Sequence, residues 1–135
     1  MYKRQVRETG SIVWVGPSPE AIDAFGIKHR ARELAEKAGV PIVPGTKGLV
    51  ESEDEAVEES EKLGYPVMLK ATGGGGGMGL VTCNDSSEVK KGFSMVRSRG
   101  ETLFKNSGLF IEKYYPASHH IEVQVGRLPV LRYNL

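Results

Sequence analysis

The residues best suited to chemistry in this sequence are five consecutive glycines at 73–77, followed by Met78 and Gly79. A glycine-rich loop lets several backbone N–H groups approach a ligand closely, and such groups bind phosphate oxygens. Met78, Gly79 and Leu80 stand where a Walker phosphate loop requires Gly-Lys-Ser/Thr, so that motif is excluded. A dinucleotide-binding loop would open a helix, whereas residues 80–82 have strand character. The run therefore predicts a flap over phosphate groups between two strands, in preference to a plain glycine linker.

Lys70 ends the short apolar segment just before the glycines, where a cation could neutralise phosphate charge. The alternative is a lysine whose stem covers apolar surface. Lys28, taken alone, is typical of a solvated helix start. Residues 112–115, Glu-Lys-Tyr-Tyr, could line an adenine slot, although on their own they favour the end of an amphipathic strand.

The polar residues His120, Glu122 and Gln124 alternate with apolar ones, which predicts a strand with one polar face. His119 would then point to the opposite face from His120, so the pair does not predict a metal site. Cys83 has no His or Cys partner at a motif spacing and is given no catalytic role.

Periodicity and capping residues predict the elements that must position these groups. We expect strands at 12–15, 66–70, 80–82, 109–114 and 120–125. We expect helices after Ser18, from Lys28 to Ala38, after Ser52 and after Asp85. This order indicates an α/β or α+β protein in which the part after the glycines packs a helix on an antiparallel sheet.

Composition narrows the class of protein. The 135 residues carry a formal charge of +1, with 39% hydrophobic and 26% charged residues. Near-neutral charge argues against a nucleic-acid binder, and no apolar run approaches the roughly 18–20 residues of a membrane span. A single cysteine and a polar start without a signal sequence predict a cytoplasmic protein, with neither nucleic acid nor membrane as a partner.

Taken together, several segments resemble the biotin carboxylase type of the ATP-grasp family, over about 12–125. The matching stretches are Val-Gly-Pro-Ser at 15–18, Gly-Ile-Lys at 26–28, Ala-Gly-Val-Pro at 38–41, Val-Pro-Gly-Thr at 43–46, Gly-Tyr-Pro-Val-Met-Leu-Lys-Ala-Thr at 64–72 with the glycines, Ile-Glu-Lys-Tyr-Tyr at 111–115 and His-Ile-Glu-Val-Gln-Val at 120–125. Residues 25–35 and 72–79 look most like urea carboxylases, the biotin-dependent half of urea amidolyases. Acyl-CoA and pyruvate carboxylases are close relatives, and a non-catalytic nucleotide-binding module is the alternative from another class.

The resemblance implies that ATP phosphorylates bicarbonate to carboxyphosphate, whose carbon dioxide passes to biotin and then, through a carboxyltransferase, to urea. The ATP site that it implies consists of Lys28, Lys70, Gly76, Gly77, Glu112, Lys113, Tyr114, Tyr115 and His120. Lys70 would meet the phosphates and the two glycines would close over them. Glu112 and the backbone of the next three residues would hold adenine, and His120 would reach toward the ribose.

The resemblance also implies what the chain holds of a longer enzyme. Residues 1–11 would be an unstructured tail, 12–45 the end of the N-terminal biotin carboxylase domain, 46–125 the ATP-grasp lid with its glycine flap, and 126–135 a tail unlike the family. Mg²⁺ and biotin would serve the full-length enzyme, with neither their ligands nor any catalytic residue in this chain. The biotinyl carrier and carboxyltransferase domains would be its partners. We expect the chain alone to be inactive.

Overall fold

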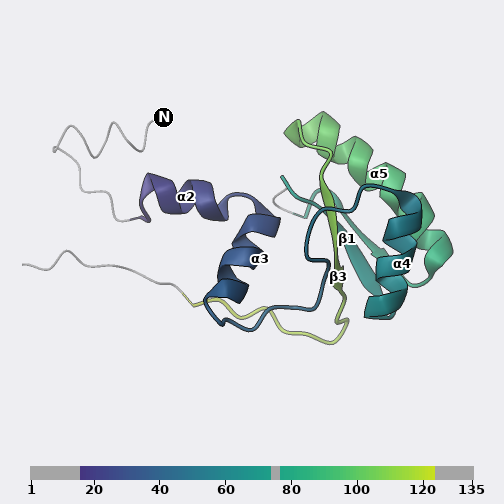
Figure 1. The fold of residues 1–135 in the computed structure, drawn as a ribbon, viewed down its shortest axis with the longest axis horizontal. Coiled ribbons are helices and arrows are strands. Elements are labelled where there is room, and N and C mark those ends of the chain that lie inside the picture. The colour runs from purple at the N-terminus through teal and green to yellow at the C-terminus, as the bar shows by residue number, and fades with distance from the viewer. Residues whose placement is uncertain (1–15, 74–76, 124–135) are drawn as a thin grey trace, which may run out of the picture.

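A three-stranded antiparallel sheet is the centre of the fold, with strand order β2-β1-β3. The computed structural model describes residues 16–73 and 77–123 (Figure 1). The strands are β1 (Val67–Ala71), β2 (Leu80–Cys83) and β3 (Leu109–Lys113). The helices are α2 (Pro19–Phe25), α3 (Lys28–Lys37), α4 (Glu53–Leu63) and α5 (Ser86–Phe104). The predicted mixture of helices and antiparallel sheet is confirmed.

The strand register divides the sheet into two unlike faces. Lys70 lies opposite Leu80 on β2 and Phe110 on β3, while Met68 lies opposite Glu112. Directly paired residues project from the same side of an antiparallel pair, and alternate residues share a face. Lys70 and Glu112 therefore project from one face, and Leu69 and Ile111 from the other.

Helices α4 and α5 cover the face that carries Leu69 and Ile111, and the hydrophobic core lies between them and the sheet (Figure 1). The buried core residues are Val50, Ala56, Val67, Leu69, Ala71, Cys83, Val89, Phe93, Val96, Leu109 and Ile111. Helix α5 comes close to the strands because Gly92 has no side chain. A Cβ there would lie 2.8 Å from Leu69 Cδ1. Gly92 thus sets the distance between helix and sheet.

The predicted helix starts are confirmed in their capping contacts. Ser18 Oγ accepts a hydrogen bond from the N–H of Ala21 at 3.2 Å, and Ser52 Oγ accepts one from Glu55 at 3.2 Å. Asp85 Oδ1 accepts one from the N–H of Glu88 at 2.9 Å. These bonds satisfy N–H groups that a helix start leaves without an intrahelical partner. Capping residues therefore fixed where these helices begin.

The expected strand at 120–125 is wrong over the part that the structure describes, because residues 120–123 belong to no strand. Ile121 and Val123 are 82% and 83% exposed, so their side chains have no apolar surface to cover. Alternating residues form a strand only where a neighbouring strand supplies hydrogen bonds. Residues 124 and 125, and the expected strand at 12–15, lie outside the described residues.

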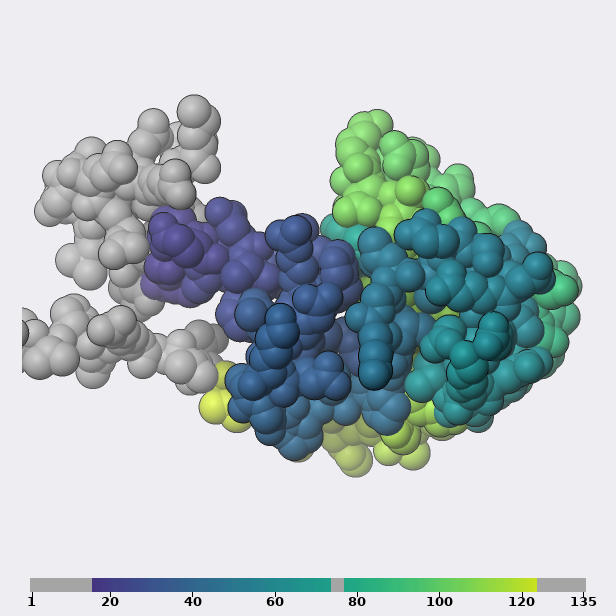
Figure 2. All heavy atoms as spheres, in the orientation of Figure 1, coloured from purple at the N-terminus to yellow at the C-terminus, as the bar shows by residue number. Residues whose placement is uncertain are grey.

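Helices α2 and α3 contribute no buried residue to the fold. Figure 2 shows them as a lobe beside the larger body built from the sheet, α4 and α5. Phe25 on α2 and Leu34 on α3 are 59% and 39% exposed. None of the helices in the described part of the chain has the length and apolar character needed to cross a membrane.

Candidate functional site

The face of the sheet that α4 and α5 leave open carries the charged residues of the site. Lys70 comes from β1 and Glu112 from β3, and Lys70 Nζ donates to Glu112 Oε2. Their side chains are 24% and 11% exposed, so the pair is largely removed from water. A carboxylate this deeply placed requires cationic or hydrogen-bonding partners. On this face the charged pair lies beside the apolar side chains of Phe110 and Leu80.

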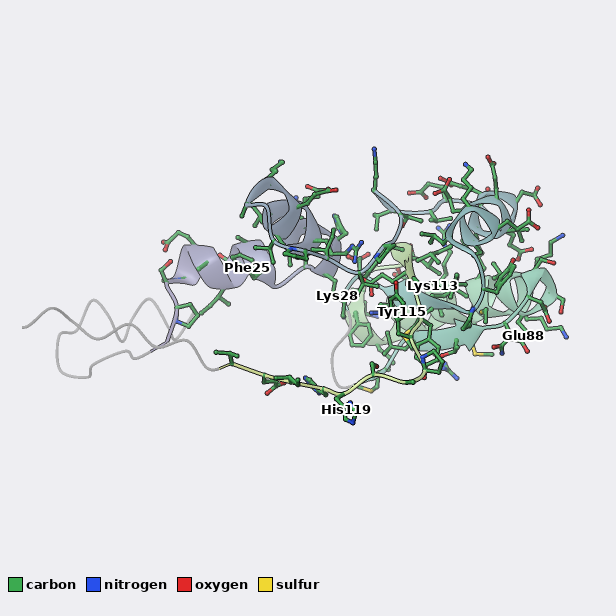
Figure 3. The ribbon with its side chains drawn as sticks, turned by 90° about the horizontal axis from the view of Figure 1, so that it is seen from below. Phe25, Lys28, Glu88, Lys113, Tyr115 and His119 are labelled. Carbon is green, nitrogen blue, oxygen red and sulfur yellow. The ribbon has the colours of Figure 1, made fainter. Side chains whose placement is uncertain are left out.

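Helix α3 brings further cations to the same carboxylate. Arg32 Nη1 donates to Glu112 Oε1, and Arg32 Nη2 donates to the carbonyl of Val43 at 2.8 Å. Lys28 stands one turn earlier on the same side of α3, since residues four apart in a helix share a face. Figure 3 shows Lys28 next to the sheet. Three cations thus surround one carboxylate, which leaves an excess of positive charge.

The pKa of Lys28 is lowered by its surroundings, which include a second positive charge. Partial burial lowers the pKa of the ammonium most, the positive charge of Lys70 lowers it further, and Glu112 opposes the shift. A group whose charged form is disfavoured gains most from an anion placed beside it. The electrostatics therefore favour a ligand with several negative charges, such as a polyphosphate.

Backbone contacts hold α3 against the end of β1, where the glycine run begins. The N–H of Lys28 donates to the carbonyl of Thr72 at 3.4 Å, and His29 Nδ1 lies 2.6 Å from Thr72 Oγ1. Beyond the run, the carbonyl of Gly79 accepts from the N–H of Ala71 at 2.9 Å. Both ends of the run therefore lie beside Lys70.

The segment 44–46 pairs with the free edge of β3 and holds the backbone on both sides of Glu112. The N–H of Lys113 donates to the carbonyl of Pro44 at 2.8 Å, and the N–H of Thr46 donates to that of Ile111 at 2.9 Å. Gly45 is required between them, since a Cβ there would lie 2.6 Å from the carbonyl of Ile111 and 2.9 Å from Arg32 Nη2. The edge segment, Arg32 and Glu112 are packed as one unit.

The structure brings together only part of the predicted site. The ammonium of Lys113 lies on the helix-covered side, where it donates to the carbonyls of Gly64 at 2.8 Å and Tyr65 at 2.7 Å. There it neutralises the carboxyl end of α4. The N–H of Tyr114 donates to the carbonyl of Pro66 at 3.0 Å.

The remaining predicted residues are exposed, except Gly76, which lies outside the described part of the chain. Tyr115 is 50% exposed. His120 is 81% exposed, and its Nε2 lies 2.9 Å from Glu122 Oε1. Figure 3 shows its neighbour His119 on the extended segment, away from the sheet. Gly77 has a positive φ of 79°, which favours glycine, and Gly76 lies outside the described residues.

Sequence reasoning missed Arg32, His29 and Thr72 as members of the site. The spacing of Lys28 and Arg32 was the available signal, because two cations four residues apart form a positive stripe on one helix face. Arg32 and His29 also line a hollow of about 230 Å³ between α3 and the segment 42–47. Its lining mixes acidic, basic and apolar side chains, so the hollow carries no strong preference for a ligand charge.

Comparison with known proteins gives matches over most of the chain. A family model described as the ATP-binding domain of the carbamoyl-phosphate synthase L chain matches residues 28–127. A putative urea carboxylase of Emericella nidulans is 68% identical over 124 residues, which are 92% of this chain and 10% of that protein. The urea amidolyase of Lachancea kluyveri is 51% identical over 84% of this chain and 6% of its own length.

A solved structure is similar as well. The biotin carboxylase domain of 2-oxoglutarate carboxylase from Hydrogenobacter thermophilus, a dimer in complex with MgADP, ADP and bicarbonate, is 35% identical with a TM-score of 0.75. The match covers 85% of this chain and 25% of that one. The chain thus spans about a tenth or less of the two urea-active relatives and a quarter of the biotin carboxylase domain.

Proposed function

Because this chain belongs to the family of the carbamoyl-phosphate synthase L chain ATP-binding domain, in its biotin carboxylase branch, we propose that it binds ATP for a biotin-dependent carboxylase, best matched by urea carboxylase. The observation that carries the proposal is the cluster of Lys28, Lys70 and Arg32 around Glu112, next to both ends of the glycine run. An excess of cations is suited to a nucleoside triphosphate, and a glycine-rich loop is typical of phosphate binding.

In the proposed reaction, ATP phosphorylates bicarbonate to carboxyphosphate, and the carbon dioxide released from it passes to a ring nitrogen of biotin. A carboxyltransferase then transfers it to urea, which gives allophanate. The identity with the Emericella and Lachancea proteins supports urea as the acceptor. Biotinyl carrier and carboxyltransferase domains would be the partners of this segment.

The proposed roles of the residues follow their positions. Lys70 and Lys28 would bind the phosphates, with Gly76 and Gly77 above them. Glu112 and the backbone of 113–115 would border the adenine, and His120 would approach the ribose only after its segment moves from the exposed position it has here. Catalysis at such a site depends on positioning and charge stabilisation rather than on a nucleophile.

The proposed division of the chain places residues 12–45 with the N-terminal domain of the carboxylase and 46–125 with the lid. The core lies entirely within 50–111, which supports a boundary near residue 46. The described residues contain no group of three or more His, Cys, Asp or Glu side chains suited to a metal ion. We therefore assign Mg²⁺ to no residue described here, and no step of the proposal passes through it.

A chimera tests the proposal. Residues 16–123 of this chain would replace the matching segment of the Emericella urea carboxylase, and bicarbonate-dependent ATP hydrolysis would be measured with and without urea. We expect the chimera to retain urea-stimulated hydrolysis. Lys70→Met should lower kcat/KM for ATP about ten- to a hundred-fold, because a charge-assisted bond of roughly 1.5–3 kcal/mol is lost.

Lys37→Met is the matched control, since Lys37 is exposed on the same helix as Lys28. Equal ATP kinetics for Lys70→Met and Lys37→Met would show that Lys70 does not bind the phosphates. A chimera that hydrolyses ATP with bicarbonate but ignores urea would contradict urea as the acceptor and leave ATP binding standing.

A further inference from the structure

Arg32 and Lys70 both bind the carboxylate of Glu112, but Arg32 makes a second hydrogen bond that holds its side chain in place. Arg32 binds Glu112 Oε1 through Nη1 and the carbonyl of Val43 through Nη2, so its guanidinium has two anchors. Within residues 16–73 and 77–123, Lys70 Nζ has one hydrogen bond, which it donates to Glu112 Oε2. The side chains of Arg32 and Glu112 are 16% and 11% exposed. Of the two cations, Lys70 is the one that can turn to another anion without breaking a second bond.

A nucleotide phosphate arriving at Lys70 competes with Glu112 for the ammonium. A carboxylate that is largely buried and loses its cation is strongly disfavoured. Glu112 avoids that state only if a second cation remains on its other oxygen. Lys28 does not take that position, because the ion pairs of Glu112 are with Arg32 and Lys70.

We propose that Arg32 is a positioning residue that keeps Glu112 paired and in place while Lys70 turns from Glu112 to the phosphates of the nucleotide. The inference rests on the proposed ATP-binding function and adds a residue to it. Arg32 acts through Glu112 and makes no contact with the ligand itself.

The geometry suits arginine better than lysine at this position. A planar guanidinium can bond a carboxylate and a carbonyl at once, whereas an ammonium is a point charge on a flexible stem. The absence of a side chain at Gly45 leaves room for the second bond, since a Cβ there would lie 2.9 Å from Nη2. Arg32 thus supplies a guanidinium that can make both bonds, and Gly45 leaves the space for the second one.

The test is a double-mutant cycle on the 135-residue chain, with ATP affinity measured by calorimetric titration. Arg32→Met should weaken ATP binding about ten-fold, the effect of losing one charged hydrogen bond. Arg32→Lys should recover part of that loss. In a Glu112→Gln background no carboxylate needs a cation, so Arg32→Met should change the affinity by no more than about two-fold. Arg30→Met, on the exposed side of α3, is the control and should have no effect.

The outcomes separate the alternatives. An equal loss from Arg32→Met with and without Glu112 would show that Arg32 meets the ligand directly and would overturn the inference. A loss that follows the melting temperature of each variant, with no recovery by Arg32→Lys, would reduce Arg32 to a structural role and would also overturn it. Absence of saturable ATP binding by the unmodified chain would contradict the proposed function itself, and the inference with it.

Discussion

Lys70 and Glu112 form their ion pair across a diagonal of the β1–β3 ladder, because Lys70 lies directly opposite Phe110 and Glu112 directly opposite Met68. Diagonal neighbours on one face of a sheet are within reach of long side chains. The pairing leaves the second oxygen of Glu112 to Arg32 on α3. Sheet and helix therefore meet at a single carboxylate.

Because of this arrangement, substitutions of Glu112 and of Lys70 should lower the free energy of unfolding by different amounts. Glu112→Gln removes the anion shared by three cations, and we expect the free energy of unfolding to fall by about 1–3 kcal/mol. Lys70→Met leaves Glu112 paired with Arg32, so the loss should be the smaller of the two. Urea denaturation of both variants measures the difference. A larger loss from Lys70→Met than from Glu112→Gln would contradict the shared-carboxylate description.

The lowered pKa of Lys28 predicts how ATP binding responds to pH. Phosphate prefers the protonated ammonium, so affinity should be greater below the lowered pKa of Lys28 and fall as pH rises through it. Lys28→Arg keeps its charge at alkaline pH and should move that fall to higher pH. Titrations of ATP across the alkaline range measure it, with Lys37→Arg as the control. Superimposable profiles for Lys28→Arg and the unmodified chain would exclude Lys28 as the titrating group.

Gly92 should tolerate no side chain. Gly92→Ala places a Cβ 2.8 Å from Leu69 Cδ1 and 3.2 Å from Val81 Cγ1, both in the packed layer between α5 and the sheet. Overpacking of this kind costs about 1–3 kcal/mol. Gly48→Ala is the matched control because its Cβ would meet nothing within 4 Å. Thermal unfolding that gave both variants the same melting temperature would show that the helix shifts without cost.

Cys83 should behave as an inert thiol. Burial raises its pKa to about 11, with smaller contributions from Glu88 and Asp85. The thiolate is the reactive form, and with a pKa of about 11 only about a thousandth of the thiol is ionised at pH 8 in the folded chain. We expect slow alkylation by iodoacetamide that becomes fast in urea.

The same shift has a consequence for stability. A folded-state pKa above the ordinary thiol value means that the folded state binds the proton more tightly. The free energy of unfolding should therefore fall as pH rises from the ordinary value toward 11. Cys83→Ala removes this part of the alkaline loss. An unchanged alkaline profile in Cys83→Ala would assign the loss to other groups.

Much of the fold could be predicted because its signals are local. Ser18, Ser52 and Asp85 cap helices through contacts within three residues, so the sequence around each one is sufficient. The strands at 67–71, 80–83 and 109–113 were recognisable as short apolar runs bounded by glycine or proline. Residues 120–125 have an alternating pattern, but residues 120–123 pair with no strand in the described part of the chain, and a pattern alone does not supply hydrogen bonds.

The site was harder to predict because its contacts are distant in sequence. Lys70 was indicated by its place just before the glycine run, and Glu112 mainly by the family resemblance. Arg32 contacts Glu112 across 80 positions, and nothing in its own neighbourhood indicates that partner. The direction of the Lys113 side chain, toward the end of α4, follows from strand register, which becomes available only when the pairing of β1 and β3 is known.

The lobe formed by α2 and α3 has no buried residue, yet α3 supplies two of the three cations around Glu112. Segments with little buried surface open at low free energy. Ligand binding to the cations of α3 would therefore also restrict the motion of that helix. Its calorimetric signature should combine a favourable enthalpy from charged hydrogen bonds with an unfavourable entropy from ordering. Amide hydrogens of residues 28–37 would then exchange more slowly in the presence of ATP, while those of β1, already protected by the core, would change little.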